Sequence, residues 1–322
     1  MDQKKWVAAF VLASTFIASH AQTNNWPTKP MRIVVPAPAG SAPDIAARAI
    51  ADKLGTSWGH QPIIENKPGA GCGIAMDYAR QAAPDGYTVV LAQAACIVVS
   101  PLTFKTFKAD IDRDFTPVSI VGVTPMLIVA NNTAPAKNLS EVIAQAKTTP
   151  DQVSMGNPAR TSIPHLAAEL IAQQMGIKLF QVSFGSSGQA TTAVVAGDVM
   201  YGLDGVAAMQ PMVKAGKLRA IAVTSDKILP GLEAYPLAKD AVPGLEVFGW
   251  FAMLAPKATP ASIVTRINED TNKALTQPDV ISQFAGFGTY PRPGTLKEAS
   301  AFIKKEQSQW TKVIKDARIQ AE

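Results

Sequence analysis

One loop near the start of the chain has the residue types of an anion-binding helix start. Residues 36–44 read PAPAGSAPD and separate an apolar run from a helical pattern. Ser41 and Asp44 have the spacing of an N-cap and its partner three residues later, and Pro43 lies in the first turn, where a missing N–H costs little. The remaining N–H groups and the positive end of the helix dipole attract anions. The sequence therefore predicts either an anion-binding turn here or an ordinary capped helix.

A second loop leads from a strand-like run into a helical one at residues 156–165 (GNPARTSIPH). Arg160 has a rigid fork of donors that suits a carboxylate, and Asn157 and Thr161 add neutral donors. His165 more often caps or packs than contacts a ligand in such a place. We therefore hypothesise that Arg160 binds an anionic group, and a structural role remains open for His165.

A third polar turn opens a helix at residues 183–188 (SFGSSG), and Asp204 ends a strand-like run. The Asp204 carboxylate can accept a hydrogen bond from an amino or hydroxyl group, or it can brace a loop. All three polar loops face one cleft only if the chain forms two lobes.

Catalytic patterns are weak in this chain. Residues 185–188 (GSSG) are one residue short of the GxSxG elbow, and a serine hydrolase could be assembled only from Ser186 or Ser187 with a distant His165. Residues 69–74 (GAGCGI) imitate a dinucleotide fingerprint but follow the second strand and end in isoleucine. HExxH and paired metal-ligand spacings are absent. The sequence therefore predicts a protein that is not an enzyme and has no cofactor or metal, with the hydrolase as the least favoured alternative.

Alternating strand-like and helical segments position these loops. Buried apolar strands that alternate with helices indicate a mostly parallel sheet with helices on both faces. The first set has strands at 31–35, 62–65 and 88–93 and helices at 43–54 and 73–83. The second has strands at 153–155, 179–184, 199–204 and 218–225 and helices at 139–148, 162–175, 188–196 and 207–215.

The last third of the chain differs, because one apolar strand at 247–256 precedes helices at 260–276, 278–286 and 295–317. One strand and three helices cannot form a third sheet, so we expect them to pack back on the first set. This predicts two α/β lobes, with residues 22–123 plus 247–322 in lobe 1 and 124–246 in lobe 2. Clefts between lobes are common sites for small ligands.

Composition and charge exclude several classes of protein. The residues AVILMFWYC make up 47% of the 322 residues and DEKR only 17%, which excludes a disordered chain. The net charge of +5 is spread thinly, without the basic run of a nucleic-acid arm. Two cysteines exclude a disulfide-built scaffold and a four-cysteine zinc site.

The first 21 residues have the pattern of an export signal. A basic start (MDQKK) precedes the apolar residues 6–18, and Ser19 and Ala21 form a small-x-small cleavage site. An apolar run of this length covers about 20 Å as a helix, which is too short for a membrane core of about 30 Å. We therefore predict cleavage after Ala21 and a periplasmic product.

In the polar loops described above and in several further segments, the chain resembles the Bug family, the extracytoplasmic solute receptors of tripartite tricarboxylate transporters. The resemblance covers essentially the whole chain after the signal. It rests on WPTKPMRIVVPAPAGSAPDIAAR (26–48), QPIIENKPGAGCGIA (61–75), APDGYTVVLAQ (83–93), DFTPVSIVG (114–122), HLAAELIAQQMG (165–176), AGDVMYGLD (196–204), VKAGKLRAIAVTS (213–225) and VFGWFAMLAPKATP (247–260).

The resemblance implies a two-lobed periplasmic binding protein of the Venus-flytrap, type II-like class. Such a receptor captures a small carboxylate, namely a di- or tricarboxylate, an acidic amino acid or an aromatic acid, and delivers it as a monomer to membrane permease subunits or to a sensor kinase. Arg160 stands in a loop that is commonly rich in Gly, Ser and Thr, which is why we hypothesise a second anionic group on the ligand. The family positions that bind ligand fall here on Pro38, Ala39, Gly40, Ser41, Asp44, Gln93, Asn157, Arg160, Thr161, His165, Ser186 and Asp204.

Cys72 and Cys96 both follow strand ends of the predicted first lobe. An oxidising compartment permits a disulfide, which would contribute about 3 kcal/mol by chain entropy. In a strand order of 2-1-3 their strands would lie about 9.6 Å apart, so the loops would have to bend inward. The pairing therefore stays open at the level of sequence.

Overall fold

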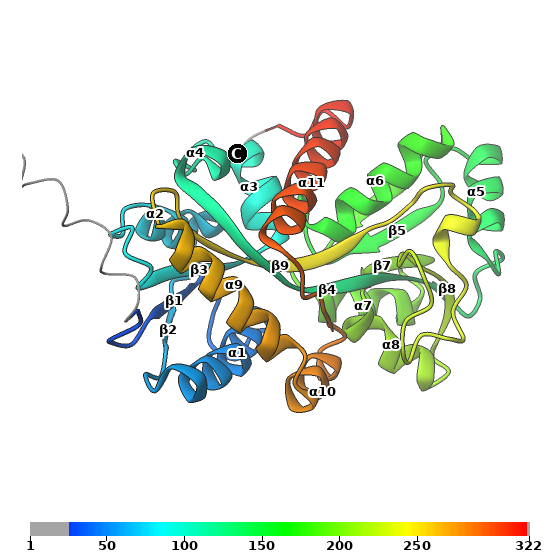
Figure 1. Cartoon of the computed structure of the whole chain (residues 1–322). Coiled ribbons are helices and arrows are strands. Elements are labelled where there is room, and N and C mark those ends of the chain that lie inside the picture. The colour runs from blue at the N-terminus through cyan, green and yellow to red at the C-terminus, as the bar shows by residue number, and fades with distance from the viewer. Residues whose placement is uncertain (1–25, 321–322) are drawn as a thin grey trace, which may run out of the picture.

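The computed structural model describes residues 26–320 and contains one ten-stranded sheet. Two long strands run through the middle of the molecule and connect two lobes (Figure 1). The predicted α/β class with two lobes is confirmed. The strands are β1 (Arg32–Val35), β2 (Ile63–Asn66), β3 (Thr88–Gln93), β4 (Phe115–Asn131), β5 (Ser154–Asn157), β6 (Phe180–Ser183), β7 (Tyr201–Gly205), β8 (Leu218–Val223), β9 (Phe248–Pro256) and β10 (Tyr290–Pro291).

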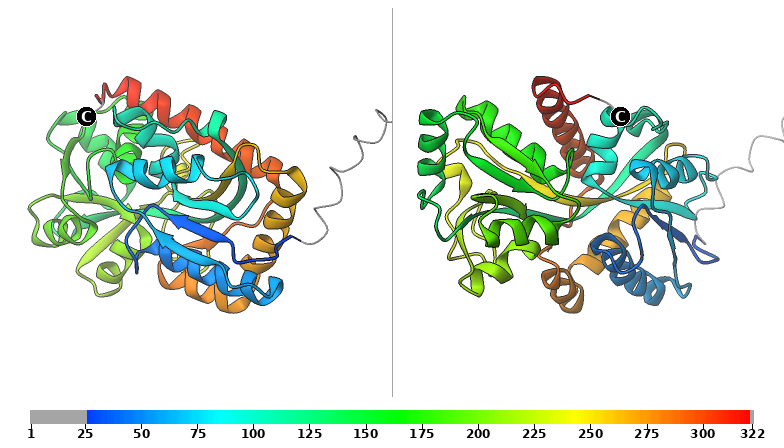
Figure 2. Two further views of the ribbon diagram at one scale, coloured as in Figure 1. Left: turned by 90° about the vertical axis from the view of Figure 1, so that its left-hand side faces the viewer. Right: turned by 180° about the vertical axis from the view of Figure 1, so that it is seen from behind.

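The helices cover both faces of this sheet (Figure 2). Most begin and end within two or three residues of the predicted positions. The helices are α1 (Ala42–Trp58), η1 (Ala70–Cys72), α2 (Gly73–Arg80), η2 (Ala95–Val99), α3 (Ser100–Thr103), α4 (Ile111–Asp114), α5 (Leu139–Thr148), α6 (Ile163–Met175), α7 (Ser187–Ala196), α8 (Val206–Lys214), η3 (Ala238–Asp240), α9 (Ala261–Leu275), α10 (Pro278–Gly286) and α11 (Leu296–Asp316).

The strand order is β2-β1-β3-β9-β4-β7-β5-β6, and β8 and β10 also pair with β4. In the first lobe β1 lies parallel to both β2 and β3, and in the second β5 lies parallel to both β6 and β7. Each lobe therefore has a parallel core of three strands, as the alternation of strands and helices predicted.

The long strand β4 connects the lobes. Its residues 115–125 pair antiparallel with β9, and residues 126–131 pair with β7 and β8. Pro117 lies at a shift of register, where a missing N–H is tolerated. The strand passes from one lobe to the other without interruption, and the lobe boundaries at 123/124 and 246/247 stay a prediction.

The hydrophobic core is continuous on one face of the sheet and divided on the other. On the first face, one cluster includes Met76 of α2, Leu166 of α6 and Trp310 of α11. On the opposite face, α1, α9 and α10 enclose a cluster in the first lobe, and α7 and α8 enclose a separate one in the second. The lobes therefore share one hydrophobic core along the first face, whereas along the other face each lobe has a core cluster of its own.

The sequence predicts no helix or strand in residues 95–114, where the structure has η2, α3 and α4. These segments are only four or five residues long, so they show no helical periodicity. The predicted signal peptide, with cleavage after Ala21, lies outside the described residues. Within residues 26–320, no helix has the length and apolar character needed to cross a membrane.

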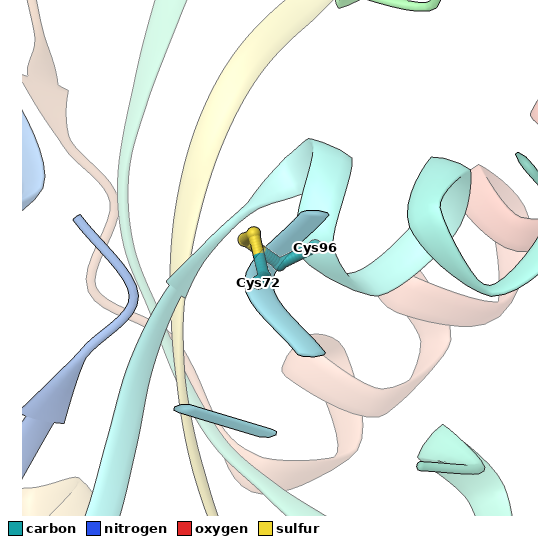
Figure 3. Close-up of a disulfide and its surroundings, with 2 residues drawn as sticks. All are labelled: Cys72 and Cys96. Carbon is teal, nitrogen blue, oxygen red and sulfur yellow. A yellow bond between two sulfur atoms is a disulfide. The ribbon is translucent and has the colours of Figure 1, made fainter. Parts of the chain in front are cut away.

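A disulfide joins Cys72 to Cys96 in the first lobe (Figure 3). Their Cα atoms are 5.4 Å apart, although β1 lies between the strands that precede them. Cys72 ends η1, at the start of the helix that leads from β2 to β3, and Cys96 lies in η2 directly after β3. The chain therefore crosses over β1 before it reaches Cys72, which supplies the inward bend that the pairing requires.

Reduction of this disulfide is expected to lower the free energy of unfolding by about 3 kcal/mol, because a closed loop of about 25 residues then gains entropy in the unfolded chain. Urea titrations with and without reductant, with thiol titration to verify reduction, measure the difference. The double variant Cys72→Ala/Cys96→Ala should match the reduced protein. An unchanged midpoint in fully reduced protein would contradict the expectation.

Candidate functional site

The predicted ligand loops lie at two sheet edges, one in each lobe. In the first lobe β1, β2 and β3 end in parallel at Val35, Asn66 and Gln93. In the second lobe β5, β6 and β7 likewise end together. The carboxyl ends of parallel strands, where helices begin, are the usual ligand sites of α/β sheets. The structure therefore gathers the predicted residues into two groups, each at the edge of its own lobe where the parallel strands end.

The loop before α1 presents an uncapped helix start. Gly40 has a φ of +79°, and the Ser41 hydroxyl turns back to donate to the Pro38 carbonyl at 2.6 Å. Ser41 is at the N-cap position but makes no side-chain cap, so the capping half of the prediction is wrong. The N–H groups of Ala42 and Asp44 lie in the first turn, where they have no partner four residues back. Because Asp44 is almost completely buried, the Ala42 amide beside the exposed Ala39 and Gly40 is the donor that this surface offers to an anion.

Asp44 holds this loop in place. Its side chain is only 2% exposed and accepts hydrogen bonds from the Gly40 amide at 2.9 Å, from Asn66 at 2.9 Å and from Arg48 at 3.0 Å. Burial alone would raise the pKa of Asp44, but the hydrogen bonds from Arg48, Gly40 and Asn66 hold it below its usual value. The carboxylate is therefore ionised, and its oxygens already accept hydrogen bonds from other residues of the protein. Its position favours a bracing role over direct ligand contact.

Asn66 is a functional candidate that the sequence analysis did not identify. It ends β2 and donates both to Asp44 and to the Ala37 carbonyl at 3.0 Å. Two segments of the ligand loop are thereby tied to the neighbouring strand. The signal in the sequence is a polar residue directly after the predicted strand at 62–65, as Asp204 is a polar residue at the end of a predicted strand.

The loop before α6 repeats the backbone of the loop before α1. The Ser162 hydroxyl donates to the Ala159 carbonyl at 2.6 Å, and Thr161 has a φ of +63° where the first loop has Gly40. A proline occupies the first turn of both helices. Unlike Ser41, Ser162 caps its helix by accepting from the His165 amide at 3.3 Å. The two lobes therefore present similar helix starts, and the one in the second lobe has fewer free donors.

Arg160 is exposed on this second loop, and no ion pair involves it among the described residues. Its guanidinium is therefore unpaired within residues 26–320, and its contact with an anionic ligand group stays a prediction. The charge also affects His165, which is 7% exposed and whose Nδ1 has no hydrogen-bond partner within residues 26–320. Burial, together with the nearby Arg160, lowers the pKa of His165 to about 4. His165 is therefore neutral at pH 7.

The stability of the protein should depend on His165 between pH 6.5 and pH 4. The unfolded chain takes up a proton near pH 6.5, whereas the folded chain resists until about pH 4. The free energy of unfolding should therefore fall by about 3 kcal/mol across this window and stay level below it with respect to this group. Urea titrations of the wild type and of His165→Gln, compared at each pH, isolate the contribution. Above pH 7 the difference in free energy of unfolding between the two proteins should not change with pH. A difference that stays constant down to pH 4 would contradict the prediction.

Asn157 is fully buried and bonded within the second lobe. Its amide donates to Gln181 at 3.2 Å and accepts from the Ser183 hydroxyl at 2.8 Å. Asn157 therefore orients the ends of β5 and β6 and is not exposed at the edge.

Ser186 is exposed and accepts from the Gln189 amide at 3.3 Å as the N-cap of α7.

The serine hydrolase alternative has no support in this geometry. Among residues 26–320, no hydrogen bond joins His165 to Ser186 or Ser187, and the Ser186 hydroxyl is used as a cap. Groups of three or more potential metal-ligating side chains are also absent from that part of the chain.

A cavity of about 920 Å³ lies away from both edges, between η2, the segment 107–113 and α11. It shares no residue with the predicted ligand loops. Its rim mixes lysines with aspartates, and two of its basic residues are already paired, Arg113 with Asp114 and Lys312 with Asp316. Its other charged residues are two lysines and two aspartates, so the lining favours neither an anion nor a cation.

The fold has two lobes, and each lobe presents a polar loop and a helix start at one edge of its sheet. These features are those of a two-lobed solute-binding receptor. The chain matches the family model described as "Tripartite tricarboxylate transporter family receptor" over residues 46–319. It is also 30% identical to protein BugT of Bordetella pertussis over 312 residues, which is 96% of each chain. This chain therefore belongs to the family of tripartite tricarboxylate transporter receptors, and the resemblance found in the sequence is confirmed.

Two solved structures of Rhodopseudomonas palustris proteins support the assignment. Rpa4515, solved with adipate, is 30% identical with a TM-score of 0.76 over 92% of this chain and 100% of that one. MatC, solved with bound malate, is 28% identical with a TM-score of 0.71 over 90% of this chain and 100% of that one.

Proposed function

We propose that this protein is a periplasmic receptor that captures a small carboxylate between its lobes and delivers it, as a monomer, to the permease subunits of a tripartite transporter. The observation that carries this proposal is the uncapped start of α1, whose loop is fixed by the ionised Asp44 and Asn66. A helix start with free N–H groups is a site for a carboxylate rather than for a neutral group. The adipate and malate of the two related receptors are of the same chemical class.

We place a second contact in lobe 2 (residues 124–246), at the free guanidinium of Arg160. Arginine binds carboxylates through two parallel hydrogen bonds, which suits the distal group of a di- or tricarboxylate. Contacts from both lobes would make the closed state more favourable when the ligand is bound, and so would shift a pre-existing equilibrium between open and closed states. The separate core clusters on the face of α1, α7 and α8 support such a motion, because the lobes share no hydrophobic core there.

A thermal-shift panel of mono-, di- and tricarboxylates, amino acids and aromatic acids tests the proposal. At least one carboxylate should raise the melting temperature, and isothermal titration should then give its affinity. Arg160→Ala should weaken a dicarboxylate at least tenfold more than a monocarboxylate, whereas Arg113→Ala, an exposed arginine in lobe 1, should change neither. A panel in which no carboxylate stabilises the protein would refute the proposed function. Equal losses for both acids in Arg160→Ala would refute only the role of Arg160.

A further inference from the structure

Asp204 is a buried carboxylate with one unused oxygen. The residue is 6% exposed, and its Oδ1 accepts the Gly205 amide at 2.7 Å. Its Oδ2 is fully buried and has no hydrogen-bond partner among residues 26–320. Leaving such an oxygen unpaired is costly, so a buried group of this kind points to a partner that arrives from outside the chain.

Asp204 lies at the edge of the second lobe, where α7 and α8 begin. It is the penultimate residue of β7 and lies opposite Leu127 of β4. Alternate residues of a strand share a face, so Asp204 shares that of Gly202, where an added Cβ would meet Val194 of α7 and Met209 of α8. Asp204 therefore lies on the face of the sheet that α7 and α8 cover.

The same face of the sheet holds the start of α1 in the first lobe. The cluster around α1 and the cluster around α7 and α8 are on this face and are separate from each other. Figure 1 shows α1 and the pair α7 and α8 on the same side of the crossing strands, opposite α11. A ligand held at the α1 start would therefore be on the side of the molecule to which Asp204 belongs.

We propose that Asp204 recognises a hydrogen-bond donor, an amino or hydroxyl group, on the bound acid and thereby selects substituted carboxylates over unsubstituted ones. This inference rests on the proposed function. An ionised carboxylate only accepts hydrogen bonds, so the group that satisfies Oδ2 must donate one. A second ligand carboxylate at this position would be repelled, which leaves Arg160 as the contact for a distal anion.

The electrostatics of the site are consistent with this role. Burial raises the pKa of Asp204, and the neighbouring Ser187 side chain and the Gly205 amide offset the effect in part. A ligand ammonium or hydroxyl at Oδ2 would add a further stabilising bond to the ionised form. Hydrogen bonds that involve a charged group discriminate strongly against analogues that lack the donor, because the protein group is then left buried and unpaired.

Matched acids that differ only in the donor test the inference. Isothermal titration at pH 7.5 compares succinate with malate and aspartate, and glutarate with 2-hydroxyglutarate and glutamate. In the wild type, at least one donor-bearing acid should bind tenfold or more tightly than its unsubstituted parent. Asp204→Asn retains the size of the side chain and one acceptor oxygen, so it should fold. It should reduce the ratio of affinities, amino acid over unsubstituted parent, at least fivefold. The affinity for the parent itself should change less than threefold. Asp198→Asn, an exposed aspartate of the same lobe, should leave the ratio unchanged.

Two results would overturn the inference without affecting the proposed function. One is tight binding of a parent acid with no advantage for its substituted forms. The other is a ratio that Asp204→Asn leaves unchanged, in which case Asp204 serves only to hold Gly205 or a buried water. If no acid of either series binds to the wild type, and no other carboxylate does, the inference and the proposed function fail together.

Discussion

Replacing Asp44 with alanine is expected to weaken carboxylate binding about a hundredfold and to lower the free energy of unfolding by about 3 kcal/mol. The side chain accepts from Gly40, Asn66 and Arg48 while almost completely buried, so its removal breaks the hydrogen bonds that these three residues make to a charged group. The loop of residues 37–41 then loses its attachment to the start of α1. The donors of this helix start remain in the chain but are no longer held in one geometry.

Isothermal titration with the best carboxylate of the panel measures the affinity, and urea unfolding measures the stability. Asp279→Ala is the matched control, because Asp279 forms an exposed ion pair with Lys53 near the end of α1. That variant should change stability by less than about 0.5 kcal/mol and should leave binding unaltered. A folded Asp44→Ala protein with wild-type affinity would show that the brace is not needed for the site.

The alternation of strands and helices was sufficient to predict the two lobes, because each βαβ unit is local in sequence. The same rule placed the ligand loops, since the carboxyl ends of parallel strands meet at one edge. Residues 95–114 could not be predicted, because a π-helix and two helices of four residues have too few turns to show a period.

The role of each residue within the loops could not be predicted from the sequence. The Ser41 hydroxyl had two acceptable partners, the helix amides ahead of it and the Pro38 carbonyl behind it, and the second is the one it uses. Asp44 is paired with Asn66, which is 22 positions away and becomes a neighbour only through the pairing of β1 with β2. Local capping rules contain no information about such a partner.

The packing of α11 is a third feature that the sequence could not fully predict. The sequence predicted that the terminal helices pack back on the first lobe, and α1 does contact α9 and α10 there. However, α11 also contacts α6 of the second lobe, where Gln173 donates to the Val313 carbonyl at 3.2 Å. A helix that contacts both lobes makes the core continuous on its face, so the stability of both lobes should depend on it.

Truncation of Trp310 is expected to lower the free energy of unfolding by about 4 kcal/mol. The side chain is fully buried in the continuous core, and its indole donates to Glu306 at 3.0 Å. The same oxygen of Glu306 accepts from Trp250 of β9 at 2.8 Å. Trp310→Ala would open a cavity between α11 and the connecting strands and would leave the buried Glu306, whose pKa burial raises, with one fewer donor.

Trp310→Phe separates the two contributions, because phenylalanine fills much of the volume but cannot donate. Its free energy of unfolding should be about 1–2 kcal/mol below that of the wild type, which is the value of a hydrogen bond to a buried carboxyl group. Lys312→Ala, which removes an exposed ion pair with Asp316 one turn further along α11, should lose less than about 0.5 kcal/mol. Urea unfolding followed by tryptophan fluorescence and by circular dichroism should give one coincident transition in each variant, since a core shared by both lobes couples their unfolding. Separate transitions in the wild type, or an Ala variant as stable as the Phe variant, would show that α11 does not join the lobes energetically.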